Sequence, residues 1–345
     1  MKIKHALALA RHSVLVSDPK MIDYLIGTRF EVGERFLALL LQEDHAVLFL
    51  NRLFPYENAQ LTIIRFGDDE DPIALLNKVW KGDTLKVDAS LASGFLLRLM
   101  RMRPLADYQA DTTMDQIRSI KDTDEIIKMR EASRLNDLVM SKVPALLKEG
   151  VKESDVYDQL MDLFKSMTEG ISFEPIIAFG EHASDPHAVA GDRILRKGEA
   201  IVIDMGCTYQ GYCSDMTRTF FLDHNGMKRV YDTVLKANLA AIAAVKPGVS
   251  LSHIDKAARD VITAAGYGSQ FVHRTGHGIG TSVHEPYPVS AESEVLCREG
   301  MIFSIEPGIY LPGTGGVRIE DLVLVTADGV EVLNSYPKHA EIIKA

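Results

Sequence analysis

Residues 201–221 read IVIDMGCTYQGYCSDMTRTFF, a stretch that predicts a β-hairpin carrying two acids. An apolar strand over residues 200–205 runs into Asp204, a turn passes through residues 209–211, and a second strand leaves carrying Asp215. A carboxylate at the end of an apolar strand is costly to bury unless a positive charge pairs with it, and neither Lys nor Arg lies between these acids. A bound cation would offset the cost of burying both carboxylates. Taken alone, however, such a pair of aspartates more often lies in solvated loops.

A segment rich in histidine and glycine, FVHRTGHGIGTSVHEP at residues 271–286, supplies the next candidate ligands, His273, His277 and His284. Glycines on both sides of His277 let the backbone come close to a ligand, and a neutral imidazole binds transition metals well. The segment does not fit the HExxH zinc motif, because Glu285 is too far along the chain from His277. A phosphate-binding loop is the weaker alternative, since the GK[ST] ending is missing. For His273 taken alone, a structural role is the simpler interpretation.

Two glutamates follow on apolar strands. MIFSIEPGIY places Glu306 at the end of one predicted strand (residues 301–305), and GGVRIEDLVLV places Glu320 inside the next (residues 317–325). Arg318 stands two positions before Glu320, so we expect both side chains on the same face of that strand. A pair of surface glutamates is the alternative, but the apolar neighbours of both acids favour burial with a partner.

Together these segments predict a centre for two divalent cations. Carboxylate oxygens can bridge two cations, and a donor set dominated by oxygen favours Mn2+, with Co2+ and Zn2+ as alternatives. Two such cations lower the pKa of a shared water and polarise a carbonyl, so hydrolysis needs no serine or cysteine nucleophile. The predicted ligands are Asp204, Asp215, His277, Glu306 and Glu320.

The 345 residues are 46% hydrophobic, which is enough for two domains with separate cores. Over residues 1–117, short apolar runs alternate with helical patterns, which predicts a small α/β domain without a cluster of chemical groups. The predicted strands there are residues 13–16, 36–41, 46–50, 62–66 and 84–88, and the predicted helices are 20–25, 73–80 and 93–100.

The second domain, residues 118–345, is predicted to be α+β. Asp122 and Glu125 can cap a helix N-terminus, and they open an amphipathic run that predicts a helix over residues 126–147. Helices and strands then come in blocks, with a further strand at residues 216–221, which favours a mainly antiparallel sheet.

Composition excludes several classes of function. A net charge of -10 disfavours binding to nucleic acid or to an anionic membrane surface. No segment approaches the roughly 20 apolar residues of a membrane span, and the short apolar stretch in MKIKHALALARHS is flanked by charge, so we expect a cytoplasmic protein. Cys207, Cys213 and Cys297 follow no zinc or redox spacing and are predicted to be small buried residues.

The order of these motifs resembles the pita-bread metallopeptidases, the group that holds methionine aminopeptidase, aminopeptidase P and prolidase. The sequences GHGIGTSVHEPYP, SIEPGIYLPGTGGVRIED and GYCSDMTRTF are similar to motifs of bacterial prolidases, in the proline-directed branch. RSIKDTDEIIKMREA resembles the start of that branch's catalytic domain, so the resemblance covers residues 118–345. Residues 1–117 are more weakly similar to a creatinase-type N-terminal domain, notably in IDYLIGT and ERFLALLL.

The resemblance implies an Xaa-Pro dipeptidase that cleaves short proline-containing peptides and forms a homodimer. The alternative is an aminopeptidase P that acts on longer peptides with proline second. A metal-free binding protein on the same fold, and a relative of creatinase, which keeps the fold without metals, are both disfavoured because all five ligand positions are filled.

The resemblance also implies roles for single residues. Asp204 would chelate one cation, His277 and Glu306 the other, and Asp215 and Glu320 would bridge them. Glu306 would in addition carry a proton from the attacking water to the leaving nitrogen.

Four further residues carry implied roles around the substrate. His187 and His284 would line the substrate site and contact the scissile peptide, with His284 stabilising the oxyanion. His273 would support the site, and Arg318 would help to hold Glu320 and bound substrate.

The segment HASDPH, residues 182–187, departs from the family pattern. Family members often carry an Asn-Ser-Ala type run before the Pro-His pair, whereas this chain has His182 and Asp185. We therefore expect these two residues to alter substrate preference.

Overall fold

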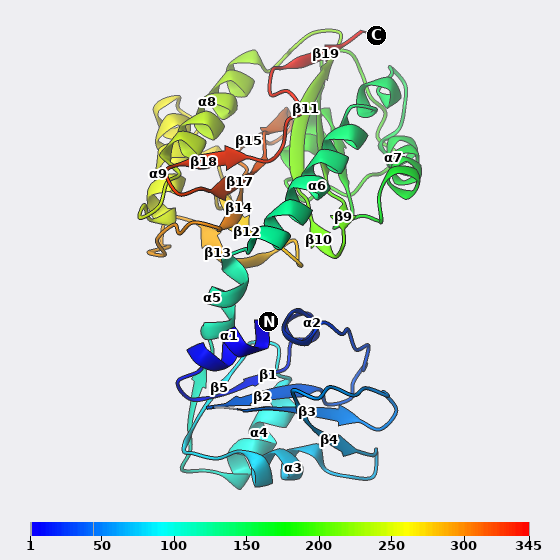
Figure 1. Cartoon of the computed structure of the whole chain (residues 1–345). Helices are drawn as coiled ribbons and strands as arrows, with labels where there is room; N and C mark the ends of the chain where they lie inside the picture. Colours follow the sequence, from blue (N-terminus) through cyan, green and yellow to red (C-terminus); the bar gives the residue numbers. More distant parts are fainter. Residues whose placement is uncertain (1, 44, 345) are drawn as a thin grey trace. The chain divides into compact units, whose positions relative to one another are not determined.

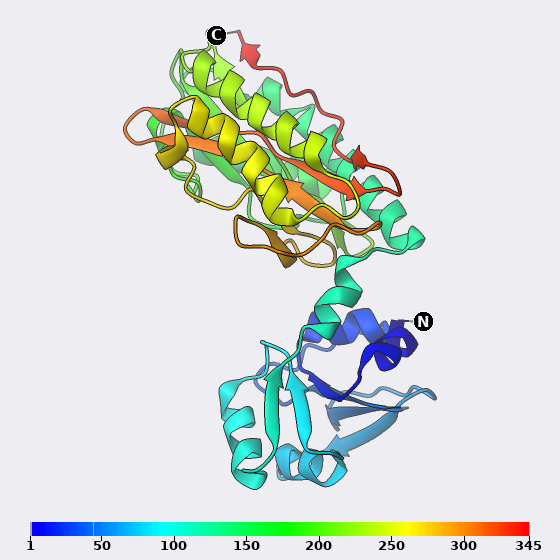
Figure 2. The same ribbon diagram turned by 90° about the vertical axis from the view of Figure 1, so that its left-hand side faces the viewer.

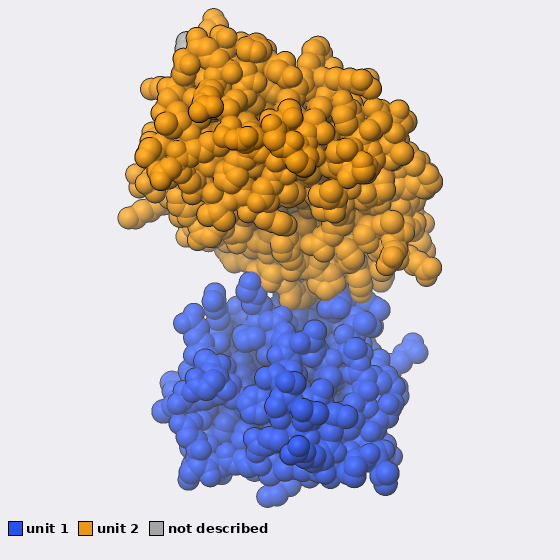
Figure 3. Space-filling model, turned by 180° about the vertical axis from the view of Figure 1, so that it is seen from behind, with its two compact units in different colours: residues 1–117 blue, residues 118–345 orange. Residues whose placement is uncertain are grey.

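The computed structural model describes residues 2–43 and 45–344. It divides into two compact units, Met1–Ile117 and Arg118–Ala345, coloured separately in Figure 3. Each unit has apolar clusters of its own. Among the described residues, no helix is both long enough and apolar enough to cross a bilayer.

The first unit is built on a six-stranded sheet with the order β4-β3-β2-β1-β5-β6, shown in blue to cyan in Figure 1. Helices α1 and α2 share one apolar cluster with the sheet, and α3 and α4 share another. α2 and α3 begin at Asp18 and Asp71, whose side chains accept a backbone N–H, and each is followed by a proline that suits the first helical position. The elements are α1 (Lys2–Leu9), β1 (Ser13–Val16), α2 (Pro19–Ile26), β2 (Ala38–Gln42), β3 (His45–Asn51), β4 (Thr62–Phe66), α3 (Pro72–Val79), β5 (Thr84–Val87), α4 (Ser93–Met102), β6 (Asp107–Ala110) and α5 (Thr113–Ser119).

All strands and helices predicted in this unit are present, with ends displaced by a residue or two. The predicted α/β class is therefore confirmed. The sequence did not predict α1, α5 or β6. The last of these, Asp107–Ala110, is polar and largely exposed, so it has no apolar alternation that would indicate a strand.

The second unit contains two main sheets, with the orders β19-β11-β8-β7 and β13-β12-β14-β17-β18. Helices α6 and α7 share an apolar cluster with the first sheet. Helices α8 and α9 run side by side, as Figure 2 shows, and they share an apolar cluster with the second sheet. The helical elements are α6 (Thr123–Met140), α7 (Glu153–Met167), α8 (Lys228–Ala244), α9 (Leu251–Ala264) and the 3-10 helices η1 (Val143–Leu146), η2 (Gly180–Ser184) and η3 (Gly268–Gln270).

The pairing in these sheets is antiparallel except between β11 and β19, which confirms the prediction of a mainly antiparallel α+β domain. A separate two-stranded ladder joins β15 to β16. The strands are β7 (Ile176–Phe179), β8 (Ala200–Met205), β9 (Thr208–Tyr209), β10 (Tyr212–Cys213), β11 (Met216–Leu222), β12 (Gly276–Gly278), β13 (Glu285–Val289), β14 (Ile302–Ile305), β15 (Gly308–Leu311), β16 (Gly315–Arg318), β17 (Asp321–Val325), β18 (Val330–Val332) and β19 (Glu341–Ile343).

Two predicted elements of this unit need correction. The helix expected over residues 126–147 ends at Met140 and is followed by η1, because Pro144 lacks an N–H and disfavours helical backbone before it. The strand expected over residues 317–325 is two strands in different ladders, β16 and β17. Between them the Glu320 N–H bonds the Thr217 carbonyl at 3.1 Å, so the backbone leaves one ladder before it joins the next.

Candidate active site

The two hairpin acids lie at one end of the β8–β11 ladder. Asp204 is the cross-strand partner of Thr217, and Asp215 immediately precedes β11. Between the two strands the chain makes a small β9–β10 hairpin whose turn falls at Gln210 and Gly211, as predicted. Both turn residues have positive φ, 47° and 80°, which matches the tight turn of a two-residue hairpin.

His277 lies in β12, between β13 and β14, and its two glycine neighbours are required there. A Cβ on Gly276 would lie 1.9 Å from the Ser304 carbonyl oxygen, and one on Gly278 would lie 2.2 Å from the Pro286 carbonyl oxygen. No side chain fits at either position. Gly276 and Gly278 therefore allow strands β12, β13 and β14 to pack closely around the buried imidazole of His277.

The structure brings the predicted ligands together. Ligand atoms of Asp215, His277 and Glu320 all lie within 4.8 Å of one another. His277 Nε2 is 3.7 Å from Asp215 Oδ2 and 3.4 Å from Glu306 Oε1. Asp204 is close enough that its charge raises the pKa of Asp215, Glu306 and Glu320, although burial is the larger cause in each case.

The chemistry of this cluster fits divalent cations. Burial raises the pKa of Glu306 to about 7 and lifts the pKa values of Asp215 and Glu320 well above their usual range. Burial also lowers the pKa of His277 to about 3, which leaves the imidazole neutral and able to bind a metal. Asp204 Oδ1 and Asp215 Oδ1 are buried without a hydrogen-bond partner among the described residues. Such oxygens are costly unless a cation occupies the space between them.

Arg318 is linked to Glu320 through Thr217 and not by a direct hydrogen bond. Arg318 Nη2 binds Asp204 Oδ2 at 2.7 Å, and its Nε donates to Thr217 Oγ1 at 3.0 Å. Thr217 in turn donates to Glu320 Oε2 at 2.7 Å, so a hydroxyl stands between the guanidinium and Glu320. The reason is the break between β16 and β17, which turns the backbone between the two residues.

His273 is linked to the acids through a chain of hydrogen bonds. Burial lowers its pKa to about 4, so the ring is neutral at physiological pH. Its Nδ1 lies 2.7 Å from the Arg274 carbonyl, which can only accept, so Nδ1 carries the proton and Nε2 accepts. Tyr310 therefore donates to His273 Nε2 at 2.8 Å and accepts from Arg318 Nη1 at 2.9 Å. Because Arg318 also binds Asp204, this arrangement suits the supporting role predicted for His273.

His284 and His187 are the accessible histidines of the site. The His284 ring lies 4.3 Å from the His277 ring in an edge-on arrangement. Burial, followed by the charge of Arg274, lowers the pKa of His284, with a further contribution from His187. His187 lies on an exposed loop after η2 and lines a cavity of about 430 Å3 with apolar neighbours such as Ile176.

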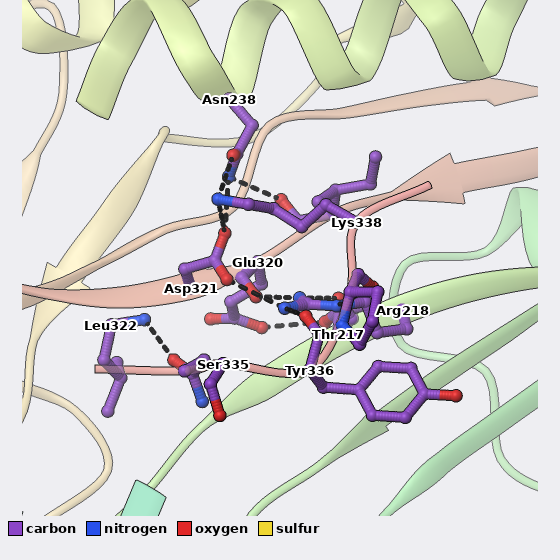
Figure 4. A network of polar contacts seen from close by, with 12 residues as sticks. Thr217, Arg218, Asn238, Glu320, Asp321, Leu322, Ser335, Tyr336 and Lys338 are labelled. Atoms are coloured by element: carbon purple, nitrogen blue, oxygen red, sulfur yellow. Dashed lines mark hydrogen bonds and ion pairs between the residues drawn. The ribbon is translucent and has the colours of Figure 1, made fainter. Parts of the chain in front are cut away.

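Behind Glu320 lies a buried ionic network, shown in Figure 4. Arg218 Nη1 donates to the Glu320 carbonyl at 2.6 Å, and Nη2 binds Asp321 Oδ1 at 2.9 Å. The other Asp321 oxygen accepts from Lys338 Nζ at 2.9 Å and from Asn238 Nδ2 at 3.2 Å. The network fixes the backbone at the break between β16 and β17, and thereby the carboxylate of Glu320.

Sequence reasoning missed three residues that orient the ligands. They are Thr217, Tyr310 and Ser304, and the last donates to Glu306 Oε1 at 3.3 Å and accepts the His277 N–H at 3.0 Å. Thr217 stands two positions after Asp215, and Ser304 stands two before Glu306, so the two-residue period of a strand was a usable signal. Tyr310 had no such signal.

Comparison with known proteins agrees with this geometry. The model of metallopeptidase family M24 matches residues 127–327. An uncharacterized peptidase of Staphylococcus aureus is 39% identical over 338 residues, which cover 94% of each chain. The chain belongs to metallopeptidase family M24.

Solved structures similar to this M24 peptidase include dipeptidases. The dipeptidase PepE of Mycobacterium ulcerans matches with a TM-score of 0.94 and 33% identity, over 100% of this chain and 97% of that one. The prolidase of Pyrococcus horikoshii matches with a TM-score of 0.86 and 30% identity, over 97% and 98%. The predicted resemblance to pita-bread metallopeptidases, and the fold class with it, is confirmed. Membership of this family implies a divalent metal, in agreement with the cluster of Asp215, His277 and Glu320.

Proposed function

We propose that this M24 peptidase is an Xaa-Pro dipeptidase that works with two divalent cations, of which Mn2+ is favoured. The observation that carries the proposal is the buried set of four carboxylates around a neutral His277, in which two aspartate oxygens lack any partner among the described residues. The similarity to a dipeptidase and to a prolidase over nearly the whole chain supports the substrate class.

We propose the ligand roles that the family resemblance implies. Asp204 would hold one cation, His277 and Glu306 would hold the other, and Asp215 and Glu320 would be shared by both. The oxygen-rich set supports Mn2+ over Co2+ and Zn2+. When bound, such cations provide a nucleophile from water near neutral pH and polarise the substrate carbonyl.

The surrounding side chains move the proton and bind the reacting group. Glu306, whose Oε1 lies 3.4 Å from His277 Nε2, is the carboxylate that would take a proton from the attacking water and return it to the leaving nitrogen. That return is needed because proline leaves as a secondary amine. His284, neutral and partly exposed beside His277, is positioned to hydrogen-bond the oxyanion, and His187 to contact the scissile peptide.

The proposal extends to the assembly and location of the enzyme. We propose a cytoplasmic homodimer, on the resemblance to the proline-directed branch and on the composition. Light scattering of the purified protein measures the assembly, and a mass near twice 38.2 kDa is expected.

The test is a substrate panel on chelated protein reloaded with Mn2+, Co2+ or Zn2+. We expect Leu-Pro and Ala-Pro to be cleaved, the matched dipeptide Leu-Ala to be cleaved far more slowly, and the chelated protein to be inactive. Equal rates for Leu-Pro and Leu-Ala would show a dipeptidase without proline preference. If Leu-Pro-Pro or a pentapeptide with proline second were tenfold better than Leu-Pro, about 1.4 kcal/mol in transition-state binding, the enzyme would be an aminopeptidase P.

A further inference from the structure

Glu153, in the first turn of α7, is a fully buried carboxylate with three hydrogen-bond donors around it. Its Oε1 accepts the Phe179 backbone N–H at 2.8 Å, and its Oε2 accepts the Gly191 backbone N–H at 3.1 Å. The His182 Nδ1 lies 2.9 Å from both oxygens. A carboxylate oxygen accepts hydrogen bonds, so His182 Nδ1 carries the ring proton and donates a hydrogen bond to Glu153.

These three donors lie along a single segment, residues 179–191, whose loop carries His187. Phe179 ends β7 just before the loop, His182 lies in η2 within it, and Gly191 closes it. One side chain from α7 therefore binds the start, the middle and the end of the segment. Apolar side chains of α7 and β7 belong to one cluster, and Figure 1 shows α7 at the right-hand side of the second unit.

The opposite side of the loop is held from the acid cluster. Arg318 Nη1 donates to the Pro186 carbonyl at 3.3 Å, directly before His187, while Nη2 of the same guanidinium binds Asp204. Within the loop, Asp185 Oδ1 accepts the His187 backbone N–H at 2.9 Å. The backbone that carries His187 is thus fixed between Arg318 on one side and Glu153 on the other.

We propose that Glu153 is a positioning residue for His187, and that His182 serves the same purpose as its side-chain donor. This inference rests on the proposed role of His187 in the substrate site. It also assigns a role to the departure in HASDPH, where His182 completes the bonding of the carboxylate and Asp185 holds the His187 amide. Neither residue needs to contact substrate to influence turnover.

A carboxylate is the side chain that this position requires. Alanine at position 153 would leave the buried Phe179 N–H and the partly buried Gly191 N–H without their acceptor, which frees both ends of the loop. Glutamine keeps one oxygen for Phe179 and His182, but its amide N–H groups would face the Gly191 N–H. Glu153→Gln is therefore the milder variant, in which the end of the loop is released and its start is retained.

The experiment is a double-mutant cycle between Glu153→Ala and His187→Ala on Mn-loaded enzyme, with the dipeptide that the wild type cleaves fastest. We expect Glu153→Ala to lower kcat/KM by about 10- to 100-fold with bound metal unchanged, as small displacements of catalytic groups do. In the His187→Ala background the same substitution should cost no more than about twofold, because it acts through His187. Glu153→Gln and His182→Ala should fall between wild type and Glu153→Ala, and they serve as the test if the alanine variant does not fold.

Asp88→Ala is the matched control. Asp88 is also a carboxylate that joins two chain segments by accepting backbone N–H groups, from Ser17 at 2.5 Å and from Asp18 at 2.9 Å. Its loss should lower the melting temperature and leave kcat/KM within about twofold of wild type.

Equal losses from Glu153→Ala in both backgrounds, or loss of metal from Glu153→Ala, would overturn the proposal. Because the cycle uses whichever dipeptide is cleaved best, a lack of proline preference in the substrate panel leaves this test intact. The two proposals therefore fail separately.

Discussion

Thr217 Oγ1 donates a 2.7 Å hydrogen bond to Oε2 of Glu320, while it accepts a bond from Arg318 Nε at 3.0 Å. The hydroxyl has one proton, and the guanidinium can only donate, so the direction of both bonds is fixed. Glu320 is thus oriented by a hydroxyl that lies outside the predicted set of ligands. Second-layer contacts of this kind commonly change metal affinity by 10- to 100-fold.

We predict that Thr217→Val weakens Mn2+ binding by about tenfold, because valine keeps the shape and removes the donor to Glu320. Calorimetric titration of the metal-free protein measures this affinity. Thr217→Ser, which keeps the hydroxyl, is the control and should bind Mn2+ nearly as the wild type does. Wild-type affinity in the valine variant would show that the hydrogen bond does not orient Glu320.

Asp215→Asn and Glu320→Gln should each abolish dipeptide hydrolysis and lower bound metal, because an amide cannot supply the charge that neutralises two cations. Elemental analysis and activity on the same preparation measure both effects. Glu331→Gln, which changes an exposed acid paired with Arg130, is the matched control and should keep full activity and metal content. Full turnover in either site variant would rule out the two-metal assignment.

For His284→Ala we expect a loss of turnover of about two to four powers of ten with metal content unchanged, since its proposed part is to hydrogen-bond the reacting group. Single-turnover rates with parallel metal analysis distinguish this from ligation. His253→Ala, at an exposed histidine on α9, provides the comparison. Loss of one metal from His284→Ala would make His284 a ligand.

The stability of the metal-free protein should fall as pH rises between about 4.5 and 7. Burial raises the pKa of Glu306 to about 7, from an ordinary value of 4.5, so the folded state holds a proton that the unfolded chain has already released in this window. The contribution of Glu306 is full below pH 4.5 and is lost as pH passes 7. Asp215 and Glu320, whose pKa values are also raised, act in the same direction.

Melting curves of wild type and Glu306→Gln, with and without Mn2+, measure this effect. The glutamine variant should show a shallower fall with pH, since it has no proton to lose at that position. Mn2+ should raise the melting temperature more at pH 7.5 than at pH 5, because metal and protons compete for the same oxygens. A metal-free wild type that is more stable relative to Glu306→Gln at pH 7.5 than at pH 5 would contradict the assigned pKa.

Local patterns predicted most of the fold and the residues that gather in the acid cluster, and long-range contacts explain what was missed. The hairpin that carries Asp204 and Asp215 is a local feature, so residues 201–221 alone predicted its strands and its turn. The bond from Arg318 to Asp204 joins residues distant in sequence and has no local signal. The break between β16 and β17 could not be predicted from residues 317–325, because the apolar pattern continues through it. Only the partner strand changes there, from β15 to β14.

The break between β16 and β17 also bears on the order in which the chain matures. Asp204 and Asp215 belong to the sheet of β8 and β11, whereas His277 and Glu306 belong to the sheet of β12 and β14, and Glu320 lies at the seam. Neither sheet alone contains a complete set of ligands. If the proposed ligands bind metal together, we expect a newly synthesised chain to acquire its complete metal site only after both sheets have docked, so that metal uptake would follow the packing of one sheet against the other.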